Sequence, residues 1–208
     1  MIVIVDYGVG NLMSVRNMAR KVGAQATISG DADEIAAADR IILPGVGHFN
    51  YGMERLRASG LVDVLNKAAL EDKKPFLGIC LGAQILGKGS EEGDAPGLGW
   101  IDMECTRFPR ADHLPVPHMM WNELEIKQPG TMLDSASDQA RYYFVHSYYM
   151  NCAAPENVVA TTRYGVEFTS VVKQGNIMGM QFHPEKSLKY GMEIIRAFNE
   201  FGTAGPAQ

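Results

Sequence analysis

The first half of the chain alternates short, wholly apolar runs with longer segments whose apolar residues recur every three or four positions. Wholly apolar runs are typical of strands covered on both faces, and the longer pattern is typical of helices with one apolar stripe. The runs that predict strands lie at 2–6, 25–28, 40–45 and 75–79. The segments that predict helices lie at 11–22, just after residue 31 or 33, at 49–72 with a break near residue 60, and at about 81–88.

The second half has a different pattern, which begins after a polar, glycine-rich loop predicted at 89–97. Short strand candidates follow one another at the spacing of antiparallel β-structure, and a last helix is predicted from about 187 to 201. The strand candidates lie at about 98–106, 114–118, 123–127, 141–150, 157–163, 166–174 and 176–182. The whole pattern predicts an α/β fold: an open mixed, mainly parallel sheet flanked by helices, with added antiparallel strands.

Nothing along the chain marks a boundary between domains, since no internal repeat, low-complexity segment or interdomain linker stands out. A length of 208 residues suits one domain with a sizeable core. We therefore expect a single domain over residues 1–208, of which 203–208 form a frayed tail.

Composition and charge restrict the partners and the compartment. Hydrophobic residues make up 46% and charged residues 21% of the chain, which is ordinary for a soluble globular protein. The net charge of −5 and the lack of any Lys or Arg run argue against nucleic acid and against a membrane surface. No apolar run approaches the roughly 20 residues of a membrane span. With no visible secretory signal and only three cysteines, we expect the cytoplasm.

The sequence gives no sign of a cofactor or a metal ion. The glycines in the segment GVGN at 8–11 could suggest a dinucleotide-binding loop, but Met13 stands where that motif needs its last glycine. No cluster of residues has the spacing of metal ligands. We therefore expect neither a cofactor nor a metal.

Cys80 ends an apolar run and is flanked by Gly78 and Gly82 in the segment GICLG. This segment has the strand–turn–helix form of the G-x-S-x-G nucleophile turn, with Cys in place of Ser. A nucleophile on such a turn needs very small residues two positions before and after it, so that strand and helix can pass closely. The backbone N–H of Leu81 could then face a developing oxyanion at the start of the helix. A buried cysteine in a glycine-containing strand is the alternative.

A nucleophilic thiol needs a base, and the base needs an orienting group. Among the five histidines, His183 has the most suitable surroundings, in the segment QFHPEKS. A predicted strand ends there, Pro184 stops its ladder, and Glu185 lies two residues beyond the histidine. This spacing lets the carboxylate reach one imidazole nitrogen while the other nitrogen faces the cysteine. A strand-end histidine beside a surface carboxylate is the alternative.

The segment LPGVG places glycines on both sides of Val46, at the end of the third predicted strand. Glycine-rich backbone can turn its N–H groups toward an oxyanion, although an ordinary strand-ending turn is the alternative. This segment, Cys80 and His183 all stand at the ends of predicted strands. We therefore expect them together at the carboxyl edge of the sheet, where the sites of α/β folds gather.

Taken together, the segments GICLGAQ, PGVG, FVHSYY and QFHPEKS resemble those of the class I, or triad, glutamine amidotransferases. The segments DYGVGNLMSV, VPHMMWN and YYFVHSYY narrow the resemblance to the glutaminase subunit of imidazole glycerol phosphate synthase in histidine biosynthesis. The resemblance covers nearly the whole chain. The segments LGWI and ILGKGSEEG lean toward a paralogous group that supplies ammonia for sugar amidation in surface-polysaccharide (O-antigen) biosynthesis.

The resemblance implies a catalytic triad acting on L-glutamine. Cys80 would attack the side-chain amide and form a glutamyl thioester, His183 would shuttle the proton, and Glu185 would orient the imidazole. The implied oxyanion hole consists of Val46, Gly47 and Leu81. The implied substrate contacts are Gly45, Gly47, Gln84, His146, Ser147 and Tyr148.

The resemblance also implies a partner. This would be a (β/α)8-barrel cyclase or synthase subunit that forms a heterodimer with the chain and receives ammonia through a tunnel. Met120 departs from the family pattern, in which a glycine is usual, so docking can differ here. Packing in the core is the alternative for the apolar members of this interface. The implied interface consists of His118, Met119, Met120, Trp121 and Asn122.

Several functions stay open at this point, and the glutaminase subunit in histidine biosynthesis is the favoured one. The first alternative is the paralogous amidotransferase subunit for sugar amidation. The second is a stand-alone cysteine hydrolase that cleaves γ-glutamyl or peptide bonds. A non-catalytic binding subunit would be expected to lack the nucleophile or the base, and this chain has both.

Overall fold

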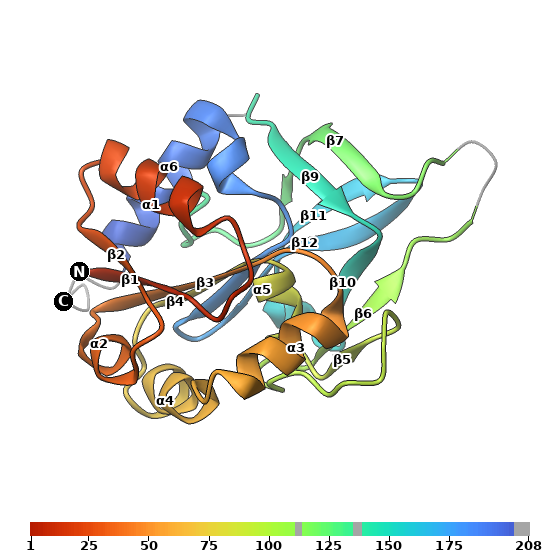
Figure 1. Ribbon diagram of the computed structural model, residues 1–208. Helices are drawn as coiled ribbons and strands as arrows, with labels where there is room; N and C mark the ends of the chain where they lie inside the picture. The colour runs from red at the N-terminus through yellow and green to blue at the C-terminus, as the bar shows by residue number, and fades with distance from the viewer. Residues whose placement is uncertain (111–113, 135–138, 202–208) are drawn as a thin grey trace.

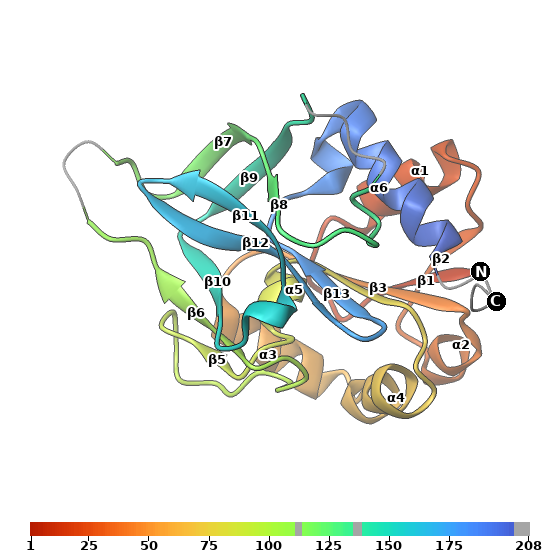
Figure 2. The same ribbon diagram turned by 180° about the vertical axis from the view of Figure 1, so that it is seen from behind.

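A computed structural model describes residues 1–110, 114–134 and 139–201 of the chain. The tail predicted at 203–208 lies outside the described residues. One large mixed sheet runs through the molecule, and helices cover both of its faces (Figures 1 and 2). The predicted fold class, an α/β fold with a mainly parallel sheet, flanking helices and added antiparallel strands, is confirmed.

Within the described residues, five strands form the parallel part of the sheet. In spatial order they are β2 (Ala26–Ser29), β1 (Ile2–Val5), β3 (Arg40–Gly45), β4 (Phe76–Cys80) and β13 (Ile177–Met180). The first four correspond to the apolar runs of the sequence. The fifth, β13, comes from the far end of the chain and was expected among antiparallel strands. It is antiparallel to one neighbour but parallel to β4.

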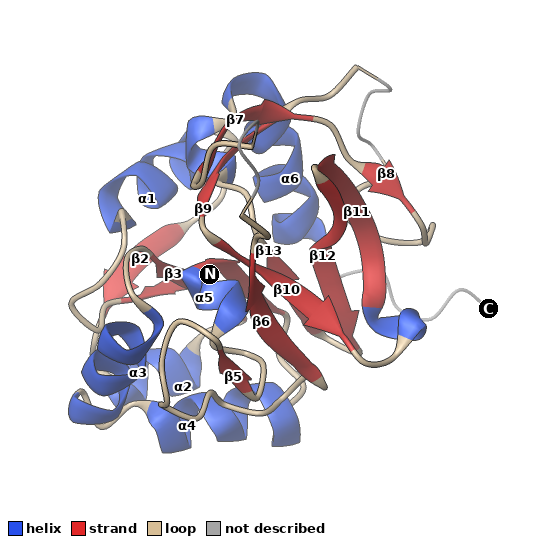
Figure 3. Cartoon of the chain, turned by 90° about the vertical axis from the view of Figure 1, so that its right-hand side faces the viewer, coloured by secondary structure: helices blue, strands red, loops and turns tan. Residues whose placement is uncertain are grey.

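The rest of the sheet is mainly antiparallel, and Figure 3 views this side of the molecule. Beyond β13 follow β12 (Val166–Gln174), β10 (Tyr148–Cys152), β6 (Met103–Arg107) and β5 (Gly89–Ser90). The strands β11 (Val158–Tyr164) and β8 (Glu125–Ile126) extend the sheet from β12 in another direction. A separate antiparallel pair consists of β7 (His118–Asn122) and β9 (Tyr142–His146).

Helices lie on both faces of the parallel strands (Figure 1). The helices α1 (Leu12–Lys21) and α6 (Leu188–Glu200) cover one face. The other face carries α2 (Ala32–Ala37), α3 (Phe49–Ala58) and α4 (Val62–Asn66), with α4 continued by a π-helical turn at Lys67–Glu71. Alternate side chains of β1 divide between the two cores, with Ile2 and Ile4 on the α1/α6 side and Val3 and Val5 on the other. None of the helices described is both long and apolar enough to cross a membrane.

The structure corrects some predicted boundaries. The helix after Cys80, α5 (Leu81–Gln84), ends earlier than the predicted 81–88, because Lys88 N–H donates to the Met103 carbonyl at 2.8 Å and draws the chain toward β6. The same contact places β5 inside the loop predicted at 89–97. The strand candidate at 114–118 lies almost wholly before β7, and the candidate at 141–150 is two strands, β9 and β10.

Candidate active site

The carboxyl ends of β3, β4 and β13 lie side by side, and a cavity of about 510 Å³ opens next to them. Residues from well-separated parts of the sequence line this cavity, as the strand-end argument predicts. The predicted site residues among them are Val46, Gly47, Cys80, Leu81, Gln84, His146, Ser147, Tyr148 and His183.

Cys80 has the strained backbone expected of a nucleophile on a sharp turn. Its φ of 53° and ψ of −112° lie outside the regions that L-residues commonly adopt. A Cβ atom on Gly78 would lie 2.6 Å from the Gly82 carbonyl oxygen, and one on Gly82 would lie 1.8 Å from the Leu43 carbonyl oxygen. Both positions therefore need glycine so that the strands and the helix can pass each other.

His183 and Glu185 form a buried hydrogen-bonded pair just after β13. The imidazole Nδ1 atom lies 2.8 Å from Glu185 Oε1, and the two side chains are only 2% and 3% exposed. The carboxylate is thus not at the surface, which rules out that alternative. The backbone N–H of His183 donates to the Tyr143 carbonyl at 2.9 Å and ties the residue to β9. Nε2 of His183 is buried and has no hydrogen-bond partner among the described residues.

The charge state of His183 suits an acid–base group. Burial alone would lower the pKa of its imidazole, but the Cys80 sulfur and the Glu185 carboxylate raise that pKa to about 10. The imidazole is therefore protonated at neutral pH when it stands beside a thiolate. A thiolate paired with an imidazolium is the reactive form of a cysteine–histidine nucleophile.

The end of β3 passes beside the start of α5. A Cβ atom on Gly45 would lie 2.7 Å from the Gly82 nitrogen, so Gly45 packs against the turn and does not line the cavity. Val46 is exposed, and Gly47 has a φ of +97°, which glycine adopts readily. Val46 and Gly47 line the same cavity as Leu81.

Two buried side-chain amides connect the cavity wall to the cysteine. Gln84 Nε2 donates to the Tyr148 carbonyl at 2.9 Å and to Gln181 Oε1 at 3.1 Å. Gln181 Nε2 in turn donates to Cys80 Sγ at 3.8 Å. The sequence analysis missed Gln181, although a polar residue at the end of a buried apolar strand, two positions before His183, is a usable signal.

Tyr7 and Glu92 also belong to the site, and the sequence analysis missed both. The Tyr7 hydroxyl donates to the Pro44 carbonyl at 2.9 Å, and burial together with the nearby Cys80 raises its pKa well above the ordinary value. Glu92 lines the cavity, and its Oε2 atom accepts from the Phe49 N–H at 2.8 Å. No local pattern marks either residue. Further cavity residues that were missed are Gly10, Asn11 and Lys186.

A family model described as "Glutamine amidotransferase class-I" matches residues 3–200. This chain is a class I glutamine amidotransferase. The membership confirms the family resemblance of the sequence, and the strained cysteine turn with its histidine and glutamate partners is consistent with it.

Curated relatives match this amidotransferase over nearly its full length. The imidazole glycerol phosphate synthase subunit HisH 2 of Pseudomonas aeruginosa is 50% identical over 200 residues, which cover 96% of this chain and 99% of the relative. The subunit of the same name from Methanococcus maripaludis is 46% identical over 198 residues, with 95% and 98% covered. The HisH subunit of Bdellovibrio bacteriovorus is 40% identical over 203 residues, with 96% and 100% covered.

Solved structures show the same fold at low sequence identity. One described as a glutamine amidotransferase superposes with a TM-score of 0.72 at 21% identity, covering 96% of this chain and 98% of the other. The structure of PurLQS from Thermotoga maritima also gives 0.72 at 21% identity, with 95% and 96% covered. This chain therefore shares the fold of these two proteins over nearly its full length.

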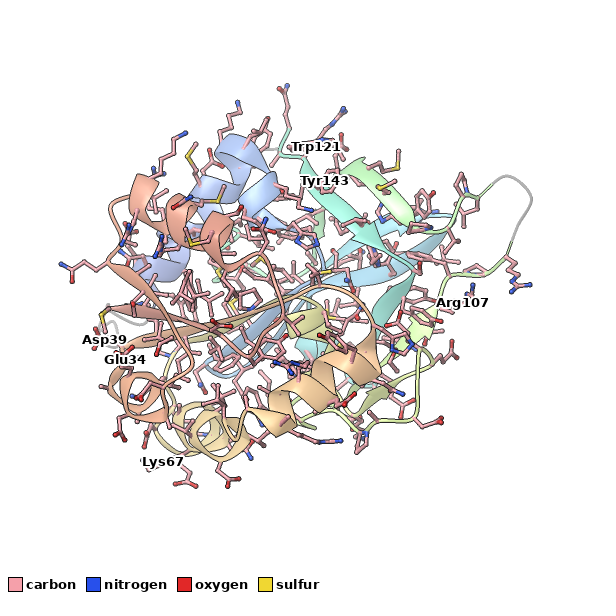
Figure 4. All side chains as sticks on the ribbon, in the orientation of Figure 1. Glu34, Asp39, Lys67, Arg107, Trp121 and Tyr143 are labelled. Carbon is pink, nitrogen blue, oxygen red and sulfur yellow. The ribbon has the colours of Figure 1, made fainter. Side chains whose placement is uncertain are left out.

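The strand β7 presents the residues that the sequence assigned to a partner interface. Met119, Met120 and Trp121 are 60%, 45% and 39% exposed, so packing in the core of this chain is the wrong alternative for them. His118 instead points inward and is fully buried. Figure 4 shows Trp121 beside Tyr143 at the edge of the molecule, and their ring centroids lie 6.0 Å apart.

Proposed function

We propose that this amidotransferase is the glutaminase subunit of imidazole glycerol phosphate synthase in histidine biosynthesis, and that it hydrolyses L-glutamine to glutamate and ammonia. The observation that carries the chemistry is His183, which lines one cavity with the strained Cys80 and is hydrogen-bonded behind it to the buried Glu185 carboxylate. Identity of 40–50% with subunits of that name, over nearly the whole chain, supports the pathway.

In the first half of the reaction, the Cys80 sulfur attacks the amide carbon of the glutamine side chain. The carbonyl π electrons move to oxygen, and the backbone N–H groups of Leu81 and of the Val46–Gly47 segment stabilise the oxyanion. The carbon–nitrogen bond then breaks while protonated His183 donates its Nε2 proton to the departing nitrogen. Ammonia leaves, and a glutamyl thioester remains on the sulfur.

In the second half, neutral His183 takes a proton from water as that water attacks the thioester carbon. The carbon–sulfur bond breaks, glutamate leaves, and the Cys80 thiolate with its imidazolium partner is restored. Glu185 accepts a hydrogen bond from Nδ1 throughout, which keeps Nε2 directed at the cavity and stabilises the charged ring. The proposed reaction draws on no metal or cofactor, and we propose that it takes place in the cytoplasm.

The ammonia requires an acceptor on a second subunit. We propose a (β/α)8-barrel cyclase subunit that forms a heterodimer with this chain and covers β7. Three consecutive exposed residues of that strand are large and apolar, as expected of a surface that becomes buried on association. His118 and Asn122 are the first and last residues of the same strand; His118 is buried and Asn122 is half-buried.

A second candidate keeps the chemistry and changes the acceptor to a sugar in surface-polysaccharide biosynthesis. Two observations favour it: Met120 replaces the usual glycine on the docking strand, and several relatives are named HisH 2, which distinguishes them from another subunit of that name. An assay with a cyclase subunit from the same genome and the nucleotide substrate of that subunit distinguishes the two candidate functions. Conversion of that substrate with glutamine as the nitrogen source supports histidine biosynthesis, and conversion only with added ammonium salt supports the second candidate.

Replacing Cys80 by Ala tests the nucleophile. We expect glutamate release to fall to background, both for the isolated chain and with the cyclase subunit, because the thioester cannot form. Cys152→Ala is the matched control, since it removes a partly buried thiol outside the cavity and should leave glutamate release unchanged. Glutamate release by Cys80→Ala would refute the assignment.

Replacing Trp121 by Ala tests the docking strand. Folding stability should fall by about 1 kcal/mol, because the side chain is 39% exposed and packs beside the Tyr143 ring, whereas stimulation of glutamine hydrolysis by the cyclase subunit should fall at least about fivefold. Leu70→Ala, which truncates an exposed apolar side chain at 39% exposure in another part of the molecule, should keep full stimulation. Equal stimulation of both variants would remove β7 from the interface. Full activity of the unmodified chain without any partner would instead favour a stand-alone hydrolase.

A further inference from the structure

Two buried histidines that the mechanism does not use lie in direct contact between β7 and the active site. Nδ1 of His118 is 3.0 Å from Nε2 of His146, and the two side chains are almost completely buried. His118 stacks between the rings of Phe144 and Tyr164, at centroid distances of 4.9 Å and 4.1 Å. A pair of imidazoles held this firmly has fixed orientations, so its hydrogen bonds can be assigned in direction.

The assignment starts at the active site. His146 Nδ1 lies 2.8 Å from the Tyr148 carbonyl oxygen, which can only accept, so Nδ1 carries the proton. Burial lowers the pKa of His146 to about 3 and that of His118 to about 4, so both rings are neutral at physiological pH. Nε2 of neutral His146 is then an acceptor, and His118 Nδ1–H must donate to it.

On the side away from the active site, His118 contacts Asn122, the last residue of β7. Nε2 of neutral His118 is an acceptor, and Asn122 Nδ2 lies 3.3 Å from it. That amide group also donates to the Arg163 carbonyl at 3.1 Å, while Asn122 Oδ1 accepts from the Glu123 N–H at 2.9 Å. These contacts orient the amide with its nitrogen toward His118. Every donor in the series therefore meets an acceptor.

At the active site, the series of hydrogen bonds joins the side-chain amides of Gln84 and Gln181. The Tyr148 carbonyl accepts from both His146 Nδ1 and Gln84 Nε2. Gln84 Nε2 also donates to Gln181 Oε1, and Gln181 Nε2 donates to Cys80 Sγ. One continuous hydrogen-bonded series thus connects the docking strand with the segment of residues 146–148 in the cavity wall and with the nucleophile.

We propose that His118 and His146 are positioning residues that fix the glutamine-binding segment at Tyr148. The proposal rests on the proposed glutaminase function. His118 is the buried residue of a strand whose next three residues are exposed, and the register of that strand places it opposite His146. The ring is hydrogen-bonded to His146, and a displaced His146 no longer holds the Tyr148 carbonyl in place.

The first test needs only the unmodified protein. Nitrogen-15 NMR of the imidazole side chains should show both rings neutral, with the proton on Nδ1, between about pH 5.5 and pH 8, because the unperturbed histidine pKa of about 6.5 is lowered by burial. A proton on Nε2 of either ring, or a charged ring in this range, overturns the proposed series of hydrogen bonds. This measurement does not depend on any enzymatic activity.

The second test compares His118→Phe with Phe168→Leu. The first variant keeps an aromatic ring and removes both hydrogen bonds, leaving His146 Nε2 as a buried acceptor without a donor. The second alters a ring that packs against both histidines, at 5.8 Å and 5.2 Å, but makes no side-chain hydrogen bond. For His118→Phe we expect the KM for glutamine to rise about tenfold, because His146 without its donor no longer holds the Tyr148 carbonyl in the wall of the glutamine site. For Phe168→Leu we expect less than a twofold change.

The reactivity of Cys80 toward two reagents distinguishes a loss of glutamine binding from damage to the catalytic triad. The glutamine analogue 6-diazo-5-oxo-L-norleucine must bind in the glutamine site before it reacts with Cys80, whereas iodoacetamide needs no such recognition. In His118→Phe we expect inactivation by the analogue to slow about tenfold and alkylation by iodoacetamide to change less than twofold.

The outcomes distinguish the proposal from its premise. An unchanged KM in His118→Phe, an equal rise in Phe168→Leu, or an equal loss of reactivity toward both reagents overturns the positioning role. If the unmodified protein, with the cyclase subunit added, neither releases glutamate nor reacts with the glutamine analogue, the glutaminase function itself fails. The NMR result stands or falls separately from both.

Discussion

Cys80 holds backbone strain at the atom where the chemistry takes place. A non-glycine residue with a φ of 53° and a ψ of −112° costs about 1–3 kcal/mol, and the surrounding contacts must hold it there. Those contacts are the backbone approaches at Gly78 and Gly82, which leave no room for a relaxed turn. The strain sets the sulfur at the cavity and directly before α5.

Replacing Glu185 by Gln should move the alkaline limb of the activity profile to lower pH. The carboxylate is one of the groups that raise the pKa of His183 to about 10, so the imidazole stays protonated up to that pH. Loss of the negative charge lowers this pKa, and the proton for the leaving ammonia is lost at lower pH. A hydrogen bond to a charged group contributes about 1.5–3 kcal/mol, so the limb of kcat/KM should move down by about one to two pH units.

Glu71→Gln provides the control for this experiment. It removes one negative charge from an exposed position outside the cavity and should leave the pH profile unchanged. A limb that stays in place in Glu185→Gln, or that moves to higher pH, would contradict the role of the carboxylate.

At the scale of elements, the turn from β4 into α5 depends on how closely three segments pass one another. The end of β3 runs beside the turn, with Gly45 paired to Cys80 in the register of the two strands. Gly82 is the second residue of α5 and faces the end of β3. Any side chain at position 82 would therefore force β3 and α5 apart.

Replacing Gly82 by Ala should destabilise the protein by about 3 kcal/mol or more, measured as the free energy of unfolding in urea. The new Cβ would lie 1.8 Å from the Leu43 carbonyl oxygen, and backbone atoms cannot rotate away as a flexible side chain can. Gly89→Ala in β5 is the matched control, because no atom lies within 4 Å of its Cβ position, and it should cost little. Similar stability of the two variants would show that the turn tolerates a side chain.

At the scale of the whole molecule, each core contains residues from both ends of the chain. Ile2 lies in the same core as Phe198, and Val3 lies in the same core as Ile177 on the opposite face of the sheet. The Arg40 side chain adds a direct connection, since its Nε donates to the Phe198 carbonyl at 3.1 Å. Neither end can leave without exposing a core, which supports our proposal that residues 1–208 form one domain.

A single domain should unfold in one cooperative transition. The variant Trp121→Phe leaves Trp100 as the only tryptophan, and Trp100 is buried edge-on against Phe76 at a centroid distance of 4.9 Å. Its fluorescence and the far-UV circular dichroism should give the same urea midpoint, because both report one all-or-none event. Two separate midpoints would indicate two units within the chain.

The sequence predicted the triad that we propose, because each of its residues stands in a recognisable local pattern. Cys80 lies between obligatory glycines, and Glu185 follows His183 at a spacing that lets the two side chains meet. The same local reasoning located the strands of the parallel half, because burial on both faces leaves an uninterrupted apolar run. It could not find Tyr7, since its role comes from a contact with Pro44, far away in the sequence.

The sequence by itself thus predicted the strands of the parallel half, the turn glycines and the residues that we propose as reacting groups, because all of these depend on neighbouring residues. Tertiary structure alone decided the rest. It placed β13 parallel to β4, so that His183 reaches Cys80, and it turned His118 inward while Trp121 and its neighbours faced solvent. The reason is physical: pairing between distant strands and burial of a side chain depend on what the rest of the chain packs against it, and no local pattern carries that information.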